Sequence, residues 1–388
     1  MGKADNVAVL HNELVRPRSR RSDEVRRTLN TVRPHPVRDG TPGTIVFGSI
    51  YPWGSQLRLA ALLRQRGYRV ERLAASGDGF RERVRSGLER IVYHRVERSL
   101  GADYAPSSLR LDALERALDA GPIDIQLDDW LAAALTGRCA DHPHFPHRTR
   151  PPFRELDLYD KVAMTTHAAE TGWPTPQCFW HPDEVGPWPR IVKPRLGGGG
   201  EGIEVVEDES ACAKAVARLG GWDQVIVQEF VRGESVRVGG IAKDGELVHA
   251  MTYRTVKSPA DPYGPSVGVA VSEVPGLLDR ARALLGPMGY TGIFGIESLQ
   301  GPDGEPRFLE MNSRVLATMS ALSTAGVDLT DDYLYAMGVL SAPSPGEVHE
   351  TEPMKVDSIR RFGRSLGWRW VVAETLLRAL TNLGKCLS

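Results

Sequence analysis

This 388-residue sequence has few cysteines and few aromatic residues, and neither positive nor negative charge predominates. It has 4 cysteines, 7% aromatic residues, and 48 lysines and arginines against 49 acidic residues, for a net charge of −1. The balanced charge gives no global reason to expect a nucleic-acid or anionic-membrane partner. The cysteines form no CxxC pair, so we expect reduced thiols rather than a zinc or disulfide framework.

Long apolar runs are also missing. No segment approaches the roughly 18 uninterrupted apolar residues of a transmembrane helix, so we expect no membrane span. Residues 1–23 contain arginines but lack the apolar core of a secretory signal. Together with the scattered cysteines, these absences predict a cytoplasmic protein.

Glycine, in contrast, is abundant, at 40 of 388 residues, where average usage is roughly 7%. The glycines have no period of three, which excludes a collagen-like chain. Hydrophobic residues make up 41% and charged residues 25% of the sequence, which is typical of a globular protein with a buried core. At about 150 residues per domain, the length predicts two to three domains.

The two ends of the chain are predicted to lie outside the folded domains. Residues 1–40 hold eight arginines and two acids between positions 16 and 38, with three prolines among them, which indicates a flexible extension. A docking or nucleic-acid arm is the alternative, although no aromatic residues interleave the arginines. Residues 346–388 are predicted to contain a basic amphipathic helix that packs on the body or on a second copy in a homodimer. Attachment to a membrane surface is the alternative for that helix.

Residues 41–150 have the pattern of a small open α/β domain followed by a linker. Strands are expected at 44–47, 68–73 and 123–127, and a helix at 56–66. A strand–helix–strand order implies a parallel sheet. Asp128 and Asp129 follow the third strand and are placed to cap a helix that runs through residue 135. The proline-rich linker carries three histidines, at 142, 144 and 147; metal binding is the alternative to a plain linker there.

From residue 151 to residue 345 the pattern becomes helix, strand, glycine-rich turn, strand, helix and strand, followed by a run of strands. Short turns between strands favour antiparallel pairing. The expected strands in this run are 225–229, 235–241, 246–252, 292–299 and 306–311, with a helix at 276–285. No internal repeat occurs, which excludes solenoids and propellers.

The glycine surplus is concentrated between two predicted strands. Gly197, Gly199 and Gly202 satisfy the GxGxxG spacing, but a dinucleotide-binding turn opens a helix, whereas residues 203–206 are an expected strand. A glycine hairpin lets backbone N–H groups close over phosphate oxygens, and Lys193 at the end of the preceding strand adds a positive charge. The alternative is a flexible hairpin with no ligand.

Three oxygen-bearing side chains on two adjacent predicted strands form a second group. Glu297, Glu310 and Asn312 flank a hairpin, and hard oxygen ligands across a ladder suit Mg²⁺. Two carboxylates at close range repel unless a cation lies between them. Glu310 and Asn312 have the same parity and share a face, as does Arg314 if the strand continues. An exposed carboxylate and a capping asparagine are the alternative.

These motifs, in this order, resemble an ATP-grasp domain over residues 159–337. The module is shared by biotin carboxylase, carbamoyl-phosphate synthetase, D-alanine–D-alanine ligase and amino-acid ligases. The series is a lysine before a helix and Pro-Thr-Pro, then Val-Lys-Pro, the glycine hairpin, Gln-Glu-Phe-Val, Gly-Glu-Ser, Ile-Glu-Ser and Glu-Met-Asn-Ser-Arg. The resemblance implies an α/β fold, in which an N-terminal open α/β pre-ATP-grasp domain (41–150) precedes a two-lobed α+β ATP-grasp domain (151–345).

The resemblance also implies roles for individual residues. The expected phosphate contacts are Lys161, Lys193, Gly197, Gly198, Gly199 and Gly200. The expected adenine and ribose contacts are Gln228, Glu229, Phe230, Val231 and Glu234. Magnesium, expected as two ions, would be held by Glu297, Glu310 and Asn312, and Arg314 would steady the acyl-phosphate. Ser313 stands where many relatives have proline, so the strand there is expected to continue differently.

The chemistry implied is an ATP- and Mg²⁺-dependent ligation of a carboxylate and an amine, both small molecules, through an acyl phosphate. Lys193 and Arg314 are then catalytic, and we expect Arg254 or Lys257 to hold the substrate carboxylate, with Arg237 as a similar candidate and a solvated turn as the alternative. A carboxylase or carbamoyl-phosphate type of reaction is a second hypothesis, although no Met-Lys-Met biotinylation segment occurs. A nucleotide-binding scaffold without turnover is the third.

Overall fold

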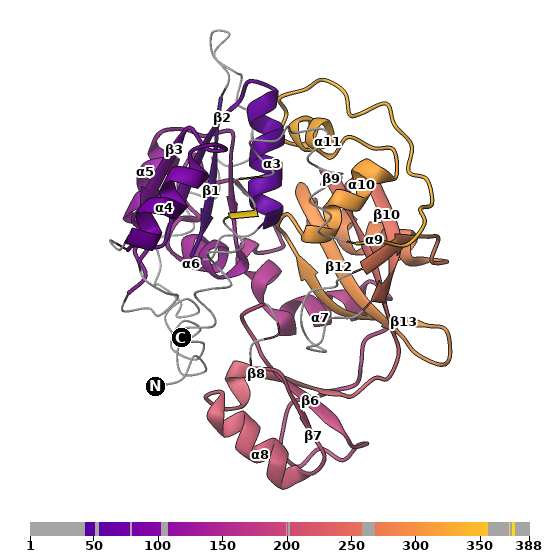
Figure 1. Cartoon of the computed structure of the whole chain (residues 1–388). Helices are drawn as coiled ribbons and strands as arrows, with labels where there is room; N and C mark the ends of the chain where they lie inside the picture. The colour runs from indigo at the N-terminus through magenta and orange to yellow at the C-terminus, as the bar shows by residue number, and fades with distance from the viewer. Residues whose placement is uncertain are drawn as a thin grey trace.

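The computed structural model describes residues 43–50, 54–77, 80–101, 108–198, 200, 202–257, 268–355, 372 and 375–376. The predicted N-terminal extension and most of the predicted C-terminal segment lie outside these residues. Figure 1 shows an N-terminal α/β unit, a large sheet beside it and a smaller lobe below both. Within the described part, no helix is long and apolar enough to cross a membrane.

The N-terminal unit is an open parallel sheet with helices, as the order of its elements predicted. Its elements are β1 (Thr44–Ser49), α3 (Gly54–Gln65), β2 (Arg69–Ala74), α4 (Phe80–Glu89), β3 (Arg95–Arg98), α5 (Asp112–Asp119), β4 (Asp124–Leu127) and α6 (Asp129–Cys139). The strand order is β3-β2-β1-β4, and all pairs are parallel. The chain therefore moves outward from β1 to β3 and then returns to the other side of β1. Such a reversal leaves a crevice at the carboxyl ends of the two strands that flank it, here β1 and β4.

The start of α6 is set by the acidic pair at the end of β4. Asp128 is the N-cap residue, and its side chain accepts a hydrogen bond from the backbone N–H of Leu131 at 3.0 Å. Such a cap satisfies one of the donors that a helix leaves open at its first turn. Asp129 is then the first helical residue, so its own side chain is available for another purpose.

The large sheet is antiparallel throughout and has the order β13-β12-β9-β10-β11-β14. In chain order its strands are β9 (Glu234–Lys243), β10 (Glu246–Lys257), β11 (Gly268–Val271), β12 (Gly292–Gln300), β13 (Pro306–Asn312) and β14 (Met354–Lys355). Asp244 (φ 56°) and Gly245 (φ 90°) form the tight turn between β9 and β10, and two positive φ values favour such a hairpin turn. The sheet carries helices α7 (Lys161–Glu170), α9 (Leu277–Met288), α10 (Ser320–Thr324) and α11 (Leu329–Ala336).

The large sheet and the N-terminal unit share one hydrophobic core. Ile45 and Phe47 of β1 belong to the same buried cluster as Ile241 of β9 and Tyr333 of α11. The other face of the sheet is covered by α7 and α9, which form a second cluster with β9, β12 and β13. Because burial of apolar area is the main favourable term in folding, the shared cluster joins the two units into one body.

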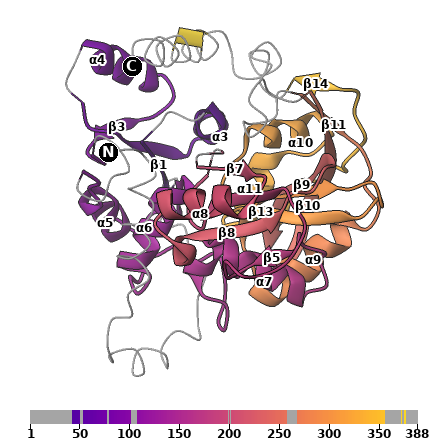
Figure 2. The same cartoon turned by 90° about the horizontal axis from the view of Figure 1, so that it is seen from below.

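The small lobe has a separate core and contains the glycine-rich hairpin. Its elements are β5 (Cys178–Phe179), β6 (Arg190–Pro194), β7 (Glu204–Val206), α8 (Glu209–Arg218) and β8 (Val225–Glu229). The sheet order is β5-β8-β6-β7, and β6 pairs with β7 antiparallel. The glycine-rich segment thus joins two strands, which confirms that it is not a dinucleotide-binding turn. Seen from below, the lobe projects in front of the junction between the N-terminal unit and the large sheet (Figure 2).

A buried polar cluster connects Arg148 of the linker with β4 of the N-terminal unit and with α11 beside the large sheet. The Asp124 carboxylate on β4 accepts hydrogen bonds from Arg148 Nη2 at 2.7 Å, from Tyr333 Oη at 2.6 Å and from Gln126 Nε2 at 2.7 Å. Asp124 and Arg148 are 1% and 7% exposed, so their ion pair is shielded from water. A buried pair is costly to break because it leaves one charge without a partner in a medium of low dielectric constant.

We predict that Asp124→Ala destabilises the protein by about 3–5 kcal/mol, because it leaves the buried Arg148 guanidinium uncompensated. The measurement is urea-induced unfolding followed by circular dichroism. The matched control is Arg150→Ala, since Arg150 pairs with Asp244 at the surface, where the two side chains are 59% and 54% exposed. An exposed pair contributes about 0–1 kcal/mol. Equal effects of the two substitutions would contradict the role of the cluster.

Candidate functional site

Lys161 lies at the joint between the large sheet and the small lobe. It is the first residue of α7, whose N-cap is Asp160. Its Nζ donates to the backbone carbonyl of Gly197 at 2.5 Å, and its backbone N–H donates to Arg195 O at 3.0 Å. Asp160 also accepts from Arg195 Nε at 2.8 Å. The helix start therefore holds both the glycine-rich segment and the strand that precedes it.

Lys193 is the second predicted phosphate lysine, and it is almost completely buried. It lies on β6 with 6% of its surface exposed. Its pKa is lowered to about 8, chiefly by burial and also by the nearby Lys161, while Glu310 and Glu297 act in the opposite direction. Desolvation disfavours the charged form of an amine. An anion placed beside both lysines would relieve this cost.

The glycine-rich segment begins against the N-terminal unit. Gly197 has φ 122°, and a Cβ there would lie 2.9 Å from the ring of Trp130. A Cβ on Gly198 would lie 3.2 Å from Asp129 Oδ2. A side chain at Gly197 would collide with Trp130 of α6, and its positive φ also favours glycine. A side chain at Gly198 would lie in tight contact with the Asp129 carboxylate. Gly200 also has a positive φ, of 77°, whereas Gly199 lies outside the described residues.

The two predicted magnesium carboxylates stand directly opposite each other. Glu297 on β12 is the register partner of Glu310 on β13, and Asn312 Nδ2 lies 3.4 Å from Glu310 Oε1. Burial and the neighbouring Glu310 raise the pKa of Glu297, while Arg237, at 2.8 Å from Glu297 Oε2, lowers it. The Asn312 amide nitrogen lies beside Glu310, and its oxygen accepts from Arg314 Nη2 at 3.2 Å. Carboxylate and amide oxygens are hard ligands, and the repulsion between the two carboxylates favours a bound cation. The donor set therefore fits magnesium.

Arg314 connects this group to the N-terminal unit. Its Nη2 donates to Asn312 Oδ1 at 3.2 Å, and its Nε donates to Asp129 Oδ2 at 2.6 Å. Burial lowers the pKa of Arg314, but the pairing with Asp129 outweighs it and the pKa is raised overall. Asp129 was expected only as a helix cap. The signal that could have placed it in the site is the pair of acidic residues at the carboxyl end of β4, where ligands of open α/β sheets bind.

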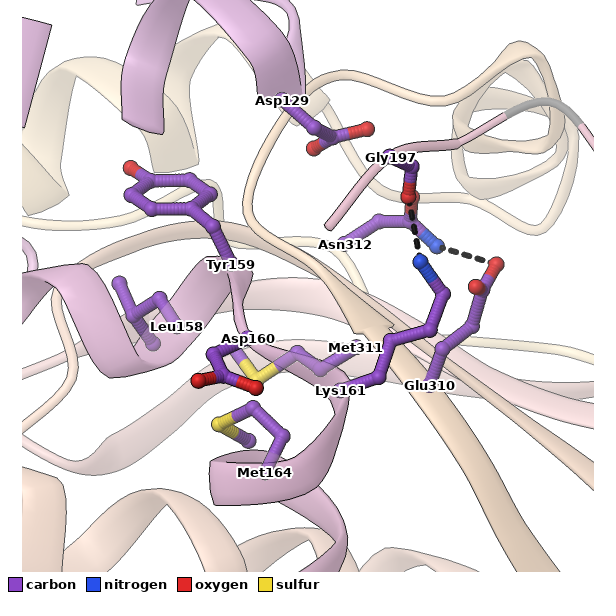
Figure 3. A pocket seen from close by; sticks show the side chains of 10 residues that line it. All are labelled: Asp129, Leu158, Tyr159, Asp160, Lys161, Met164, Gly197, Glu310, Met311 and Asn312. Atoms are coloured by element: carbon purple, nitrogen blue, oxygen red, sulfur yellow. Dashed lines mark hydrogen bonds between the residues drawn. The ribbon is translucent and has the colours of Figure 1, made fainter. Parts of the chain in front are cut away.

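One pocket collects the predicted residues from three separate segments (Figure 3). It is lined by Asp129, Leu158, Tyr159, Asp160, Lys161, Met164, Gly197, Glu310, Met311 and Asn312. In the view, Lys161 and Glu310 lie on one side of Asn312, and Asp129 projects from the end of α6 above them. The pocket thus joins a predicted phosphate lysine, the start of the glycine-rich segment and two of the predicted metal ligands.

The predicted adenine and ribose residues lie on β8 and at the start of β9. Gln228 is fully buried, and its Nε2 donates to Cys178 Sγ at 3.4 Å. Its Oε1 has no hydrogen-bond partner among the described residues. The backbone N–H of Phe230 donates to Pro189 O at 3.1 Å. Glu229 ends β8 and Val231 follows Phe230, so these residues lie where the lobe meets the large sheet.

Arg254 lies beside the predicted ribose carboxylate. Its Nη1 is 3.2 Å from Glu234 Oε2 and donates to Gln300 Oε1 at 2.7 Å. Arg237, the other arginine considered for the substrate carboxylate, pairs with Glu297 instead. The side chain of Lys257 lies outside the described residues. The role of Arg254 toward a substrate carboxylate stays a prediction.

The linker histidines bind protein groups. His142 Nε2 lies 3.2 Å from Asp119 Oδ1, and His144 Nδ1 lies 2.9 Å from Leu118 O. Across the part of the chain that the structure describes, no group of three or more His, Cys, Asp or Glu side chains is placed to hold a metal ion. The magnesium set proposed from the sequence differs in kind, since it combines two carboxylates with an amide.

Comparison with known sequences identifies the central part of the chain. Residues 158–318 match the sequence model of the family described as the ATP-grasp domain. The chain contains an ATP-grasp domain. The match covers the two lysines predicted to contact phosphate, the glycine-rich segment, the carboxylate pair and Arg314, all of which the resemblance had pointed to. No curated protein sequence matches the chain.

Solved structures share the fold of the ATP-grasp domain together with the N-terminal unit. The N5-carboxyaminoimidazole synthetase from Staphylococcus aureus complexed with ADP has a TM-score of 0.61 at 13% identity, covering 79% of this chain and 80% of that one. The biotin carboxylase domain of the Hydrogenobacter thermophilus 2-oxoglutarate carboxylase, with MgADP and bicarbonate, has a TM-score of 0.61 at 13% identity, covering 81% and 74%. The L-amino acid ligase from Bacillus licheniformis has 0.56 at 13%, covering 79% and 76%. At these identities the likeness shows the fold alone.

We predict that ATP affinity, measured without magnesium, falls about tenfold as the pH rises from about 7 to about 9.5, because Lys193 loses its charge above its pKa of about 8 and a hydrogen bond from a charged donor is lost. The sign follows from the lowered pKa: Lys193 is protonated below it and neutral above it. The measurement is isothermal titration calorimetry across that range. Lys193→Arg, whose guanidinium stays charged, should flatten the profile. A steep profile in that variant would assign the pH dependence to another group.

Proposed function

We propose that this protein is an ATP- and Mg²⁺-dependent carboxylate–amine ligase that forms an amide or peptide bond through an acyl phosphate and releases ADP and phosphate. The observation that carries the proposal is the single pocket in which Lys161, Gly197, Glu310 and Asn312 meet. Phosphoryl transfer requires little covalent chemistry from the protein, because positioning and charge stabilisation suffice. Those are the contributions that this set of side chains can make.

In the first step, an oxygen of the substrate carboxylate attacks the γ-phosphorus, the bond to the bridging oxygen breaks, and ADP departs with the electron pair. Lys161 and Lys193 neutralise charge that spreads over the phosphoryl oxygens. The glycine-rich segment brings backbone N–H groups to the same oxygens and excludes water. Glu297, Glu310 and Asn312 would hold magnesium, which would supply further neutralisation of the phosphates.

In the second step, the amine attacks the acyl carbon and phosphate leaves. Arg314 steadies the oxyanion of the tetrahedral intermediate, since its guanidinium is already oriented by Asn312 and Asp129. Gln228 to Val231 and Glu234 are proposed to hold the adenosine. A homodimer and a cytoplasmic location stay predictions from the sequence.

A carboxylase is the second candidate. The support for it is the likeness of fold to a carboxyaminoimidazole synthetase and to a biotin carboxylase domain crystallised with bicarbonate. In that reaction, bicarbonate takes the place of the organic acid as the group that attacks ATP. The phosphate lysines, the metal ligands and Arg314 would act in the same way.

The proposed function predicts ADP and phosphate as products, together with a new amide. The experiment incubates the full chain with MgATP and pairs of amino acids, and detects condensation products by mass spectrometry. A separate arm replaces the amino acids with bicarbonate. Amide formation with ADP release supports the ligase, and ADP release that depends on bicarbonate alone supports the carboxylase. Formation of AMP and pyrophosphate would exclude the acyl-phosphate route, while ATP binding with no turnover in any arm would support a scaffold.

We predict that Glu310→Gln lowers ADP production by about 100-fold or more, because it removes one charged metal ligand while keeping the side-chain volume. The melting temperature should not fall, since the change removes one of two facing carboxylates. Steady-state ADP release and thermal unfolding check the two parts. The matched control is Glu305→Gln on the same hairpin, where Glu305 pairs with Arg280 near the surface. Full activity in Glu310→Gln would contradict the metal assignment.

A further inference from the structure

Among the described residues of the N-terminal unit, Asp129 is the one whose side chain lines the pocket with the proposed phosphate lysine and metal ligands. It begins α6, directly after β4, and β4 lies beside β1 at the reversal of strand order. Ligands of open α/β sheets bind outside the carboxyl ends of strands at such a reversal. Asp129 therefore lies at the carboxyl end of β4, where such a ligand would bind, and at the same time lines the pocket.

Only one of the two carboxylate oxygens of Asp129 accepts a hydrogen bond from a described residue. Oδ2 accepts the hydrogen bond from Arg314 Nε at 2.6 Å. Oδ1 receives no hydrogen bond from any residue that the structure describes, and an ionised carboxylate can accept about four. The side chain is 18% exposed, and Gly198 passes close to it. Oδ2 thus orients Arg314 and also lies beside Gly198, whereas Oδ1 is left to accept a hydrogen bond from a ligand.

The other acids of the pocket have different partners. Asp160 caps α7 and forms an ion pair with Arg195 at 2.6 Å. Glu310 faces Glu297 and lies within 3.4 Å of Asn312, in the proposed metal site. Among the described carboxylates that line the pocket, Asp129 alone neither caps a helix nor belongs to the proposed metal site. It is also the neighbour of Arg314, which the proposed mechanism places at the acyl group.

We propose that Asp129 is the binding residue for the acceptor amine, with Oδ1 receiving the ammonium group at the mouth of the β1–β4 crevice. This inference rests on the proposed function. As the nitrogen attacks the acyl carbon, one ammonium proton passes to the Asp129 carboxylate. The carbon–oxygen bond to phosphate then breaks, and phosphate leaves with the electron pair and takes a second proton from the nitrogen. The products are the neutral amide, hydrogen phosphate and a protonated Asp129.

The position of Asp129 explains why one side chain would serve both substrates. A carboxylate that binds Arg314 and an ammonium group at once places the nucleophile beside the cation that steadies the oxyanion. Near-attack placement of this kind supplies much of the acceleration in a two-substrate reaction. The acceptor is accordingly expected to be a primary amine that is protonated at neutral pH, such as an amino acid.

The test compares a charged acceptor with an uncharged one in the same reaction. Wild type and Asp129→Asn are incubated with MgATP, a mixture of the proteinogenic amino acids, ammonium chloride and hydroxylamine. Hydroxylamine is uncharged near neutral pH and traps acyl phosphates as hydroxamates. Asparagine keeps an oxygen for Arg314 but has no charge to hold an ammonium group. We expect the ratio of amide to hydroxamate, measured by mass spectrometry, to fall about tenfold or more in Asp129→Asn.

The matched control is Asp128→Asn, which removes the same charge one residue away and keeps the helix cap, because asparagine caps as well as aspartate. Its product ratio should equal that of the wild type. An unchanged ratio in Asp129→Asn, or an equal loss of both products, would overturn the inference, as would a wild type that forms hydroxamates but no amide. A wild type that forms neither product would instead overturn the proposed function itself.

Discussion

Glu297 and Glu310 stand opposite each other on β12 and β13, where burial raises the pKa of Glu297, and on the facing side Lys193 is buried near Lys161. Like charges kept close and away from water are unfavourable unless opposite charges lie among them. Arg237 partly neutralises Glu297. The two lysines favour an anion in the space between them and the glutamates. A magnesium–nucleotide complex, the proposed ligand, would satisfy both groups at once.

The three groups of elements contribute to this arrangement in different ways. The N-terminal unit and the large sheet share a core and the buried Asp124–Arg148 pair, which hold Asp129 and the predicted metal ligands in one body. The small lobe has its own core, and polar contacts from the start of α7 hold the glycine-rich segment, including the bond from Lys161 to Gly197. The pocket therefore lies where a rigid platform meets a lobe attached by polar contacts.

Much of the ATP-grasp domain could be predicted from the sequence, since it rests on local patterns. The sequence predicted a strand, and not a helix, after the glycines, which excluded a dinucleotide-binding turn. The antiparallel pairing of β6 with β7 confirmed that strand. The parity of Glu310 and Asn312 placed them on one face of a strand, and they do lie within hydrogen-bond distance. These inferences succeed because strand periodicity and turn chemistry are properties of a few consecutive residues.

What no local pattern contains is contact between distant segments. By its sequence Asp129 is an acidic residue at a helix start; only the packing of the N-terminal unit against the large sheet brings it to Arg314, 185 residues later in the chain. In the sequence, Arg237 and Arg254 are equivalent candidates on neighbouring strands. The register of β9 with β12 pairs Arg237 with Glu297, whereas Arg254 forms an ion pair with Glu234. The sequence by itself determined the chemical groups and their local secondary structure. The tertiary structure decided which charges meet, because electrostatic pairing depends on distance in space and not on separation along the chain.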